Sequence, residues 1–263
     1  MLRYIPFARK PPLVAVIRLS GVISAGGRGL NDAGMAPLIE RAFRKGKPAA
    51  VALVINSPGG APVQTALLAA RIRRLAEDKG IRVHAFVEDV AASGGYWLAT
   101  AADQIWLDAS SVVGSIGVIS AGFGFDQLME RYGVERRVHT AGGSKSFLDP
   151  FKPEKPEDVV RLRALQDPIH QAFIAQVRAR RGERLAMADL FTGDVWVGAQ
   201  AVGVGLADGI GHLVPKMREL FGDKVRFAQH EARRSLLQRF GIGAMADLVG
   251  AAEDRALWAR YGL

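Results

Sequence analysis

The fold of this chain is decided by residues 50–79, AVALVINSPGGAPVQTALLAARIRRLAEDK. Ala50 to Ile55 form a continuous apolar run without the alternation of a half-exposed strand, which predicts a strand buried on both faces. The sequence Asn56-Ser57-Pro58-Gly59-Gly60 then interrupts this run with turn-forming residues. From Pro62 to Lys79, leucine and isoleucine recur at helical spacing. The stretch therefore predicts a strand, a sharp turn and a helix in succession, which is one unit of a parallel α/β sheet.

The same alternation is repeated on both sides of this unit. Short apolar runs predict further strands, and helical spacing predicts further helices between them. Such alternation at short intervals is typical of a mostly parallel sheet with helices on its faces, so we expect an α/β protein. The expected strands are Leu13–Ile17, Val83–Val87 and Gln104–Leu107, and the expected helices run from Asn31 or Asp32 to about Lys45 and over Ser93–Ala102.

After Val118 we expect a helix over Phe125–Tyr132, a strand over Glu135–Thr140 and a long helix over Pro156–Arg181. Residues 229–263 combine apolar residues with arginines, which predicts an amphipathic helical tail. Such a tail would pack against the body or a sister subunit, or lie at a membrane surface. We therefore predict one compact domain over residues 1–228 and a C-terminal helical tail over residues 229–263.

Composition narrows the function. The chain has 263 residues, no cysteine and a formal net charge of +9. Without cysteine, disulfides and thiolate chemistry are excluded, and no ligand spacing or phosphate-binding loop predicts a metal or another cofactor. The basic clusters fit solvated helix faces or contact with an anionic membrane surface, whereas no nucleic-acid motif accompanies them. Neither a signal peptide nor a transmembrane helix is evident, so we expect a cytoplasmic or peripherally membrane-associated protein.

Two residues 52 positions apart carry the expected chemistry. Ser93 lies in Ala91-Ala92-Ser93-Gly94-Gly95, directly after a predicted strand, and Lys145 lies in a Gly/Ser loop. A serine hydroxyl becomes an effective nucleophile when a base takes its proton, and a neutral lysine amine can be that base. The backbone N–H groups of Gly60 and Gly94 could stabilise an oxyanion. The pair therefore indicates a serine–lysine hydrolase.

Each of these residues also has a simpler interpretation. The glycine pair at Gly59 and Gly60 can form an ordinary tight turn. Ser93 can be a plain N-cap of the following helix, a position that serine often occupies. Lys145 can be a solvated loop residue.

Four motifs, taken in order, resemble one protein family. They are Asn-Ser-Pro-Gly-Gly at 56–60, Ala-Ser-Gly-Gly-Tyr-Trp at 92–97, Gly-Ser-Ile-Gly-Val at 114–118 and Gly-Ser-Lys at 143–145. Together they resemble the signal peptide peptidase A (SppA) family of serine–lysine proteases, peptidase family S49, over roughly Val14 to Gly211. The resemblance implies a crotonase/Clp-protease-like fold of repeated ββα units.

The resemblance also implies roles for individual residues. Ser93 matches the family's nucleophile, Lys145 its general base, Gly60 its oxyanion glycine and Ser115 the serine that positions the lysine. Family members cleave remnant signal peptides and, in some cases, unfolded proteins, so apolar peptides are the expected substrates, bound as an added strand along Val112–Phe125. A homo-oligomeric ring or dome, with possible peripheral membrane contact, is the expected assembly.

Three alternatives remain open. A crotonase-type enzyme acting on acyl-CoA thioesters would use the same backbone oxyanion donors without Ser93 or Lys145, and a non-catalytic scaffold would use the fold to bind peptides. A stomatin-cleaving or phage capsid-maturation serine–lysine protease is a closer alternative. A Ser-His-Asp triad of the related Clp type would place a histidine about 25 residues after Ser93, where Val118 stands.

Overall fold

The computed structural model describes residues 11–26, 29–143, 145–186, 189–231 and 255–263. The strands are β1 (Leu13–Ser20), β2 (Ala50–Ser57), β3 (Arg82–Ala92), β4 (Gln104–Leu107), β5 (Val112–Gly114), β6 (Val195–Val197), β7 (Gly209–Ile210) and β8 (Arg226–His230). The helices are α1 (Asp32–Arg44), α2 (Pro62–Lys79), α3 (Gly94–Ala99), α4 (Asp126–Arg131), α5 (Pro156–Arg181), α6 (Gly198–Gly203) and α7 (Leu213–Phe221), with a 3-10 turn at Gly182–Arg184.

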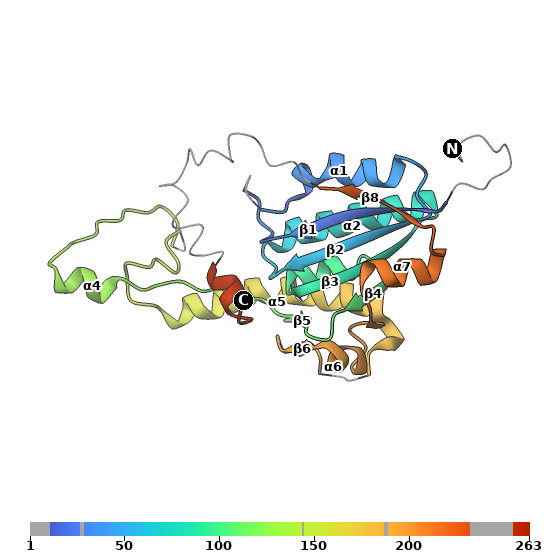
Figure 1. Cartoon of the computed structure of the whole chain (residues 1–263). Helices are drawn as coiled ribbons and strands as arrows, with labels where there is room; N and C mark the ends of the chain where they lie inside the picture. Colours follow the sequence, from blue (N-terminus) through green and yellow to red (C-terminus); the bar gives the residue numbers. More distant parts are fainter. Residues whose placement is uncertain (1–10, 27–28, 144, 187–188, 232–254) are drawn as a thin grey trace.

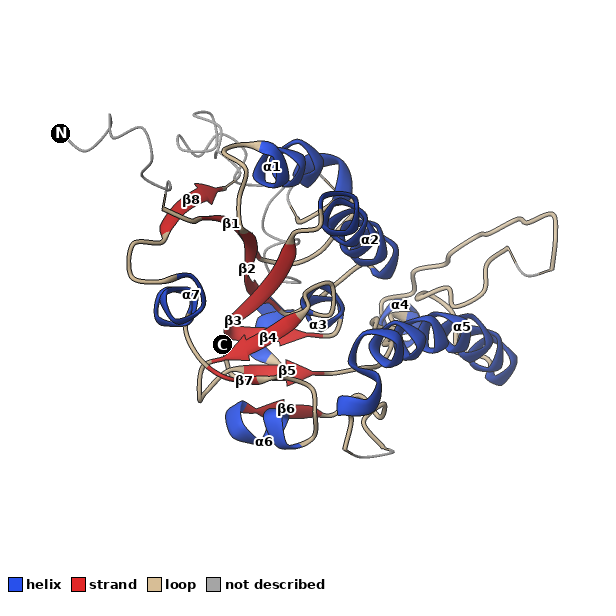
Figure 2. Ribbon diagram, turned by 90° about the vertical axis from the view of Figure 1, so that its right-hand side faces the viewer, coloured by secondary structure: helices blue, strands red, loops and turns tan. Residues whose placement is uncertain are grey.

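The strands form one sheet in the order β6-β5-β3-β2-β1-β8, and β4 joins β3 to β7. All of these pairs are parallel except β5 with β6, which is antiparallel. Helices α1, α2 and α3 cover one face of the sheet, and α7 lies on the opposite face (Figures 1 and 2). The mostly parallel α/β architecture predicted from the sequence is confirmed.

Strand β2 shows why its sequence is apolar without alternation. Val51, Leu53 and Ile55 belong to the larger core beneath α1 and α2, whereas Ala52 and Val54 belong to the smaller core on the α7 side. Each apolar residue therefore contributes to one of two cores, and burial of both faces accounts for the uninterrupted run.

The predicted strand over Glu135–Thr140 is wrong. This segment has no strand pairing and most of its side chains are exposed, because it lies in a part of the chain that leaves the sheet. We call residues 119–143 and 145–155 the arm. The arm carries α4 and extends away from the body in both views (Figures 1 and 2). A single extended segment without a partner strand has no means of satisfying its backbone hydrogen bonds as a strand.

The arm exposes apolar side chains to solvent. Phe123 is 81% exposed and Tyr132 is 72% exposed, which is unusual for large hydrophobic residues that gather in one segment. The others are Ile119, Phe125, Leu128, Val134 and Phe151.

The predicted tail lies mainly outside the described residues, since 232–254 are not among them. Within its predicted range, residues 229 and 230 belong to β8, which pairs with β1 at the edge of the sheet, and residues 255–259 are helical. Strand β8 was not predicted. None of the helices in the described ranges has the length and apolar character needed to cross a membrane.

Candidate active site at the ends of β2, β3 and β5

Ser93 stands between β3 and α3 in a strained backbone conformation. Its φ of 51° and ψ of −122° lie outside the regions that residues with side chains adopt freely. Its N–H donates to the Gly114 carbonyl oxygen at 2.8 Å, and its own carbonyl oxygen accepts from the N–H groups of Tyr96 and Trp97 at 3.0 Å. The half-buried side chain makes no capping hydrogen bond to α3. The plain N-cap interpretation of Ser93 therefore does not describe this geometry.

The turn after β2 lies directly against Ser93. A methyl group built on Gly59 would come within 2.8 Å of both Ser93 Cβ and Gly94 N, and one built on Gly94 would lie 3.4 Å from Gly60 N. Gly60 has a φ of 138°, and any side chain there would collide with the Ile23 carbonyl oxygen. These close approaches require glycine. The structure thus brings Gly60, Ser93 and Gly94 together.

Two backbone N–H groups at this junction donate to no acceptor among the described residues. Ile23 N–H donates to the Gly59 carbonyl oxygen, and Ala61 N–H donates to the Ile23 carbonyl oxygen, each at 2.8 Å. In such a parallel bridge the N–H of the residue between, Gly60, points away from Ile23. Gly94 is the first residue of α3, and its N–H has no partner within the helix. Both groups are available to an oxygen atom beside Ser93.

A bulge fixes the position of this turn. The β2–β3 register shifts between Ile55 and Ser57, and Asn56 bridges the irregularity. Its Nδ2 donates to Asp89 Oδ2 at 2.6 Å, while its Oδ1 accepts from Val90 N–H at 3.3 Å. The side chain of Asn56 therefore ties the turn after β2 to β3, the strand that leads to Ser93.

Ser115 lies at the same edge of the sheet. Strand β5 pairs with β3 through Ala92 and Gly114, so Ser115 follows the residue that accepts the Ser93 N–H. Its φ is 52°, and its N–H donates to the Asp194 carbonyl oxygen at 2.6 Å. The half-buried Ser115 is thus held close to Ser93 through backbone bonds on both sides.

Lys145 is not brought to this junction in the single chain. It lies in a turn of the arm, where its N–H donates to the Gly142 carbonyl oxygen at 3.2 Å, and its side chain is exposed. No hydrogen bond or ion pair of Lys145 with Ser93 or Ser115 is formed among the described residues.

No histidine hydrogen-bonds to Ser93 in the described part of the chain. His84 is buried on the opposite face of the sheet, where its ring packs edge-on against Phe221 and burial lowers its pKa. His212 pairs with Asp108 at 2.8 Å, and His170 Nε2 donates to the Ile116 carbonyl oxygen at 3.0 Å. His139 is exposed in the arm, and His230 is buried in β8.

Sequence reasoning missed the residues that frame the junction. Ile23 supplies the backbone that pairs with the Gly59–Gly60 turn, and Thr65 Oγ1 lies 2.7 Å from the position of a methyl group on Gly94. Tyr96 is fully buried beneath the site; its hydroxyl donates to the Leu206 carbonyl oxygen at 2.8 Å, and burial raises its pKa. Ile23 and Thr65 lie outside the four motifs, so only their spatial neighbours mark them, whereas Tyr96 lies within the motif at 92–97 and was assigned no role.

The mostly parallel sheet with strand–turn–helix junctions at its carboxyl edge is consistent with the crotonase/Clp-protease-like class of α/β folds, and the comparison with solved structures supports this class. A solved structure with a similar fold is a serine-to-alanine mutant of 1510-N, a membrane-bound stomatin-specific protease. It has a TM-score of 0.52 and 14% identity, and the match covers 86% of this chain and all of that chain.

A model of peptidase family S49 matches residues 75–220, more than half of the chain. The chain belongs to peptidase family S49. It is 33% identical to "Serine protease SPPA, chloroplastic" of Arabidopsis thaliana over 76% of this chain and 31% of that protein. It is 48% identical to "Na(+)/H(+) antiporter NhaA" of Brucella melitensis biotype 1 over 95% of this chain and 37% of that protein. The chain thus spans about a third of the length of these two relatives.

Proposed function

We propose that the protein is a serine endopeptidase with Ser93 as nucleophile and Lys145 as general base. The observation that carries this proposal is the packing of the Gly59–Gly60 turn against Ser93 and Gly94, where two N–H groups beside a strained serine have no acceptor within the described part of the chain. Strained backbone at a residue that makes no capping bond is typical of a catalytic position. Membership of a peptidase family supports the same assignment.

The proposed reaction has two halves. The neutral amine of Lys145 takes the proton of Ser93 Oγ while Oγ bonds to the substrate carbonyl carbon, and the N–H groups of Gly60 and Gly94 hold the oxyanion. The Lys145 ammonium then protonates the departing amine as the C–N bond breaks, which leaves an acyl-serine. A water molecule gives its proton to Lys145 and attacks the acyl carbon, and Ser93 leaves with the proton from Lys145. Ser115 orients the lysine amine. Because a protonated lysine cannot act as base, activity rises toward alkaline pH.

The exposed position of Lys145 supports an assembled form of the protein. The arm must pack against something for its lysine to reach a serine, and its exposed apolar side chains need burial of the kind that subunit contact provides. We infer a homo-oligomer in which the arm folds over the Ser93 junction of its own copy or of a neighbour.

Complementation distinguishes these two arrangements. Ser93→Ala and Lys145→Ala chains are each inactive in the proposed mechanism. If a serine works with the lysine of a neighbouring copy, mixing the two variants in equal amounts restores about a quarter of the wild-type sites. If each copy uses its own lysine, the mixture stays inactive.

The proposed substrates are apolar peptides such as remnant signal peptides and segments of unfolded proteins. The sequence predicts that such peptides bind as a strand along Val112–Phe125. The first part of this stretch, β5, already pairs with β3 on one edge and with β6 on the other. Residues 116–125 that follow belong to no strand and remain for a substrate strand. A peptide bound there would pass Ser115 and approach the Ser93 junction.

Peripheral membrane contact is part of the proposal. The net charge of +9 favours anionic surfaces, and the Brucella relative that contains a similar segment bears the name of an ion antiporter. Flotation with vesicles of anionic and of neutral lipid tests this contact, and equal recovery in the unbound fraction with both would refute it.

The main experiment compares wild type, Ser93→Ala and Lys145→Ala on an unfolded casein-like protein and on a hydrophobic signal-like peptide at mildly alkaline pH. Circular dichroism confirms that each variant is folded. Cleavage by wild type alone supports the dyad, and activity that survives in Lys145→Ala refutes the role of the lysine. A folded wild type that cleaves neither substrate but binds acyl-CoA would replace the proposal with the thioester enzyme.

A further inference from the structure

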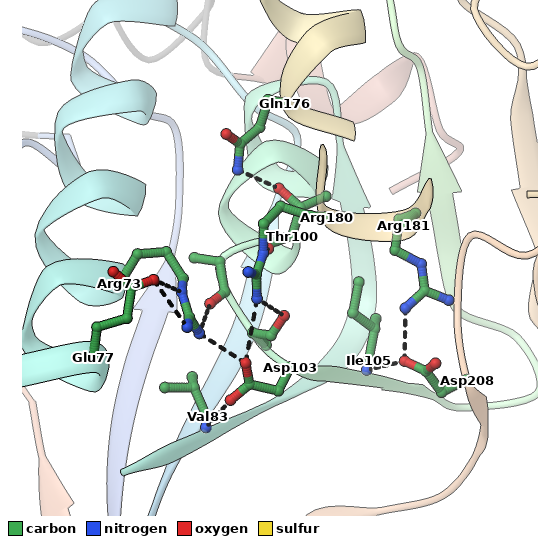
Figure 3. Close-up of polar contacts among 12 residues, drawn as sticks. Arg73, Glu77, Val83, Thr100, Asp103, Ile105, Gln176, Arg180, Arg181 and Asp208 are labelled. Atoms are coloured by element: carbon green, nitrogen blue, oxygen red, sulfur yellow. Dashed lines mark hydrogen bonds and ion pairs between the residues drawn. The ribbon is translucent and has the colours of Figure 1, made fainter. Parts of the chain in front are cut away.

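Two arginines hold the C-terminal end of the short helix that begins at the nucleophile (Figure 3). Arg180 of α5 donates from Nε to the Thr100 carbonyl oxygen at 3.0 Å and from Nη2 to that of Ala102 at 3.2 Å. Arg73 of α2 donates from Nη1 to the Ala101 carbonyl oxygen at 3.2 Å. Three successive carbonyl groups after α3 therefore each accept a guanidinium N–H.

Asp103 keeps these two cations side by side. Its Oδ1 accepts from Arg73 Nη1 at 2.8 Å and from Arg180 Nη2 at 3.2 Å, and its Oδ2 accepts from the Val83 N–H of β3 at 2.8 Å. The shared carboxylate offsets the repulsion between the two guanidinium groups and ties them to the strand that ends at Ser93.

Helix α5 contacts α3 in two further ways. Gln176 Nε2 donates to Thr100 Oγ1 at 3.1 Å, and Thr100 Oγ1 donates to the Trp97 carbonyl oxygen at 2.6 Å. The rings of Phe173 and Trp97 stack with centroids 5.0 Å apart. The C-terminal half of α5 thus contacts α3 and the residue that follows it through the side chains of Arg180, Gln176 and Phe173.

These contacts matter because α3 has only six residues. A helix of this length has no stability of its own, so its position is set by what packs around it. Its N-terminal end is Ser93, which has no side-chain cap to hold it. A shift at the C-terminal end of α3 therefore moves Ser93 and Gly94 relative to the Gly59–Gly60 turn.

The same helix α5 also carries the arm. The arm leads directly into Pro156, and α5 then runs 26 residues, about 39 Å at the usual helical rise, to Arg181. One continuous helix therefore connects the segment that bears Lys145 to the contacts that hold the helix of Ser93 (Figure 1).

We propose that Arg180 is a positioning residue for the reaction at Ser93. By binding the carbonyl groups of Thr100 and Ala102, it fixes α3 and so keeps Ser93 and Gly94 in place relative to the Gly59–Gly60 turn. Gln176 assists through Thr100. This inference rests on the proposed function, because it assigns Arg180 to the serine of that reaction.

The test uses a fluorophosphonate probe on the full chain. Ser93 Oγ bonds to phosphorus, fluoride leaves, and the hydroxyl proton passes to the base. The end-point of labelling counts folded sites, whereas the rate constant per labelled site reports the geometry of the nucleophile. A merely structural role of Arg180 would lower the end-point and leave the rate constant unchanged.

Arg180→Met is compared with Arg180→Lys and with Arg184→Met. Arg184 lies in the same cluster and reaches the Asp103 carbonyl oxygen at 3.4 Å and Asp208 at 3.6 Å, but it touches no carbonyl of residues 100–102. We expect Arg180→Met to lower the labelling rate constant and kcat by about 10- to 100-fold with little change in KM, since small displacements of a nucleophile have effects of this size. Arg180→Lys should recover part of the rate, and Arg184→Met should match wild type.

A rate constant for Arg180→Met within twofold of wild type, with Ser93 labelled in both, overturns the inference and leaves the proposed function standing. Equal loss in Arg184→Met also overturns it, because a general effect of charge would then explain both. If Arg180→Met does not fold, Gln176→Met gives the same comparison, and an unchanged rate constant refutes the link through Thr100. If wild type is not labelled at Ser93, the proposed function fails and the inference falls with it.

Discussion

A methyl group on Gly94 should stop catalysis for a reason that can be separated from its effect on stability. In Gly94→Ala the new carbon would lie 2.7 Å from Thr65 Oγ1, 3.2 Å from Ile23 Cδ1 and 3.4 Å from Gly60 N. The φ of Gly94 is not positive, so the backbone accepts alanine and the cost is steric. We expect the free energy of unfolding to fall by about 1–3 kcal/mol, the usual cost of overpacking. The rate should fall by about 10²- to 10³-fold, since the methyl group crowds the space beside the proposed oxyanion donor Gly60.

The double variant Thr65→Ala/Gly94→Ala separates the two effects. Thr65→Ala removes the closest contact and also the hydrogen bond from Thr65 Oγ1 to the Ala61 carbonyl oxygen, which is worth about 1 kcal/mol. Because the two changes relieve each other, the double variant should be more stable than the sum of the single losses. Its rate should stay low, since the methyl group still lies beside Gly60 N.

The assay is urea unfolding followed by circular dichroism, together with cleavage of a fluorogenic apolar peptide. Gly203→Ala is the matched control, because a methyl group there meets nothing within 4 Å. It should leave both quantities close to wild type. A folded double variant that cleaves at the wild-type rate would refute the assignment of the oxyanion to the space between Gly60 and Gly94.

Three further outcomes test the structure around the site. Tyr96→Phe should lose about 1–3 kcal/mol in urea unfolding, because the buried Leu206 carbonyl oxygen is left without its donor. Asp208→Ala should lose about 3–5 kcal/mol in the same measurement, since it leaves the guanidinium of Arg181, whose side chain is 2% exposed, without its carboxylate; a smaller loss than for Tyr96→Phe would contradict this. Burial lowers the pKa of His84 in the folded chain. As the pH drops below about 6.5, the unfolded chain therefore binds more protons than the folded one, and stability decreases as the pH is lowered. His84→Gln should flatten this decline in the melting temperature between neutral and mildly acidic pH, and an unchanged slope would count against it.

The sequence predicted the regular elements best where the local signals agreed with the tertiary environment. Helices α2 and α5 coincide with the predicted ranges, because proline at the first turn and helical spacing of apolar residues mark their lengths. Strand β4 also has its predicted bounds. Strand β3 is six residues longer than predicted, five of them at its C-terminal end, since Glu88 and Asp89 interrupt the apolar run while the backbone pairing continues past them.

The elements that were missed depend on partners distant in the chain. Strand β8 has mixed polarity and becomes a strand because it pairs with the edge of β1, more than 200 residues earlier. The predicted strand over Glu135–Thr140 fails for the opposite reason, since its β-branched residues have no neighbouring strand. Pairing across long sequence separations is not encoded in a local pattern.

For the site, motif and spacing identified Gly60, Ser93, Gly94 and Ser115, and the structure gathers these four at one edge of the sheet. Their roles in the reaction remain predictions. The sequence could not indicate where Lys145 lies, because a Gly/Ser loop carries no information about which surface it will meet.

The backbone strain at this edge argues that the hydroxyl groups matter more here than local stability. Ser93 and Ser115 have φ values of 51° and 52°, and only two other non-glycine residues in the described ranges, Lys47 and Leu148, share positive φ. Glycine would adopt these conformations without the cost of about 1–3 kcal/mol that a side chain incurs. The two serines directly follow the neighbouring strands β3 and β5, which are connected there by the hydrogen bond from Ser93 N–H to the Gly114 carbonyl oxygen, so the strain is concentrated at one place. What glycine cannot supply is a hydroxyl group. The chain therefore keeps serine at both strained positions, as expected if one hydroxyl attacks the substrate and the other orients the base.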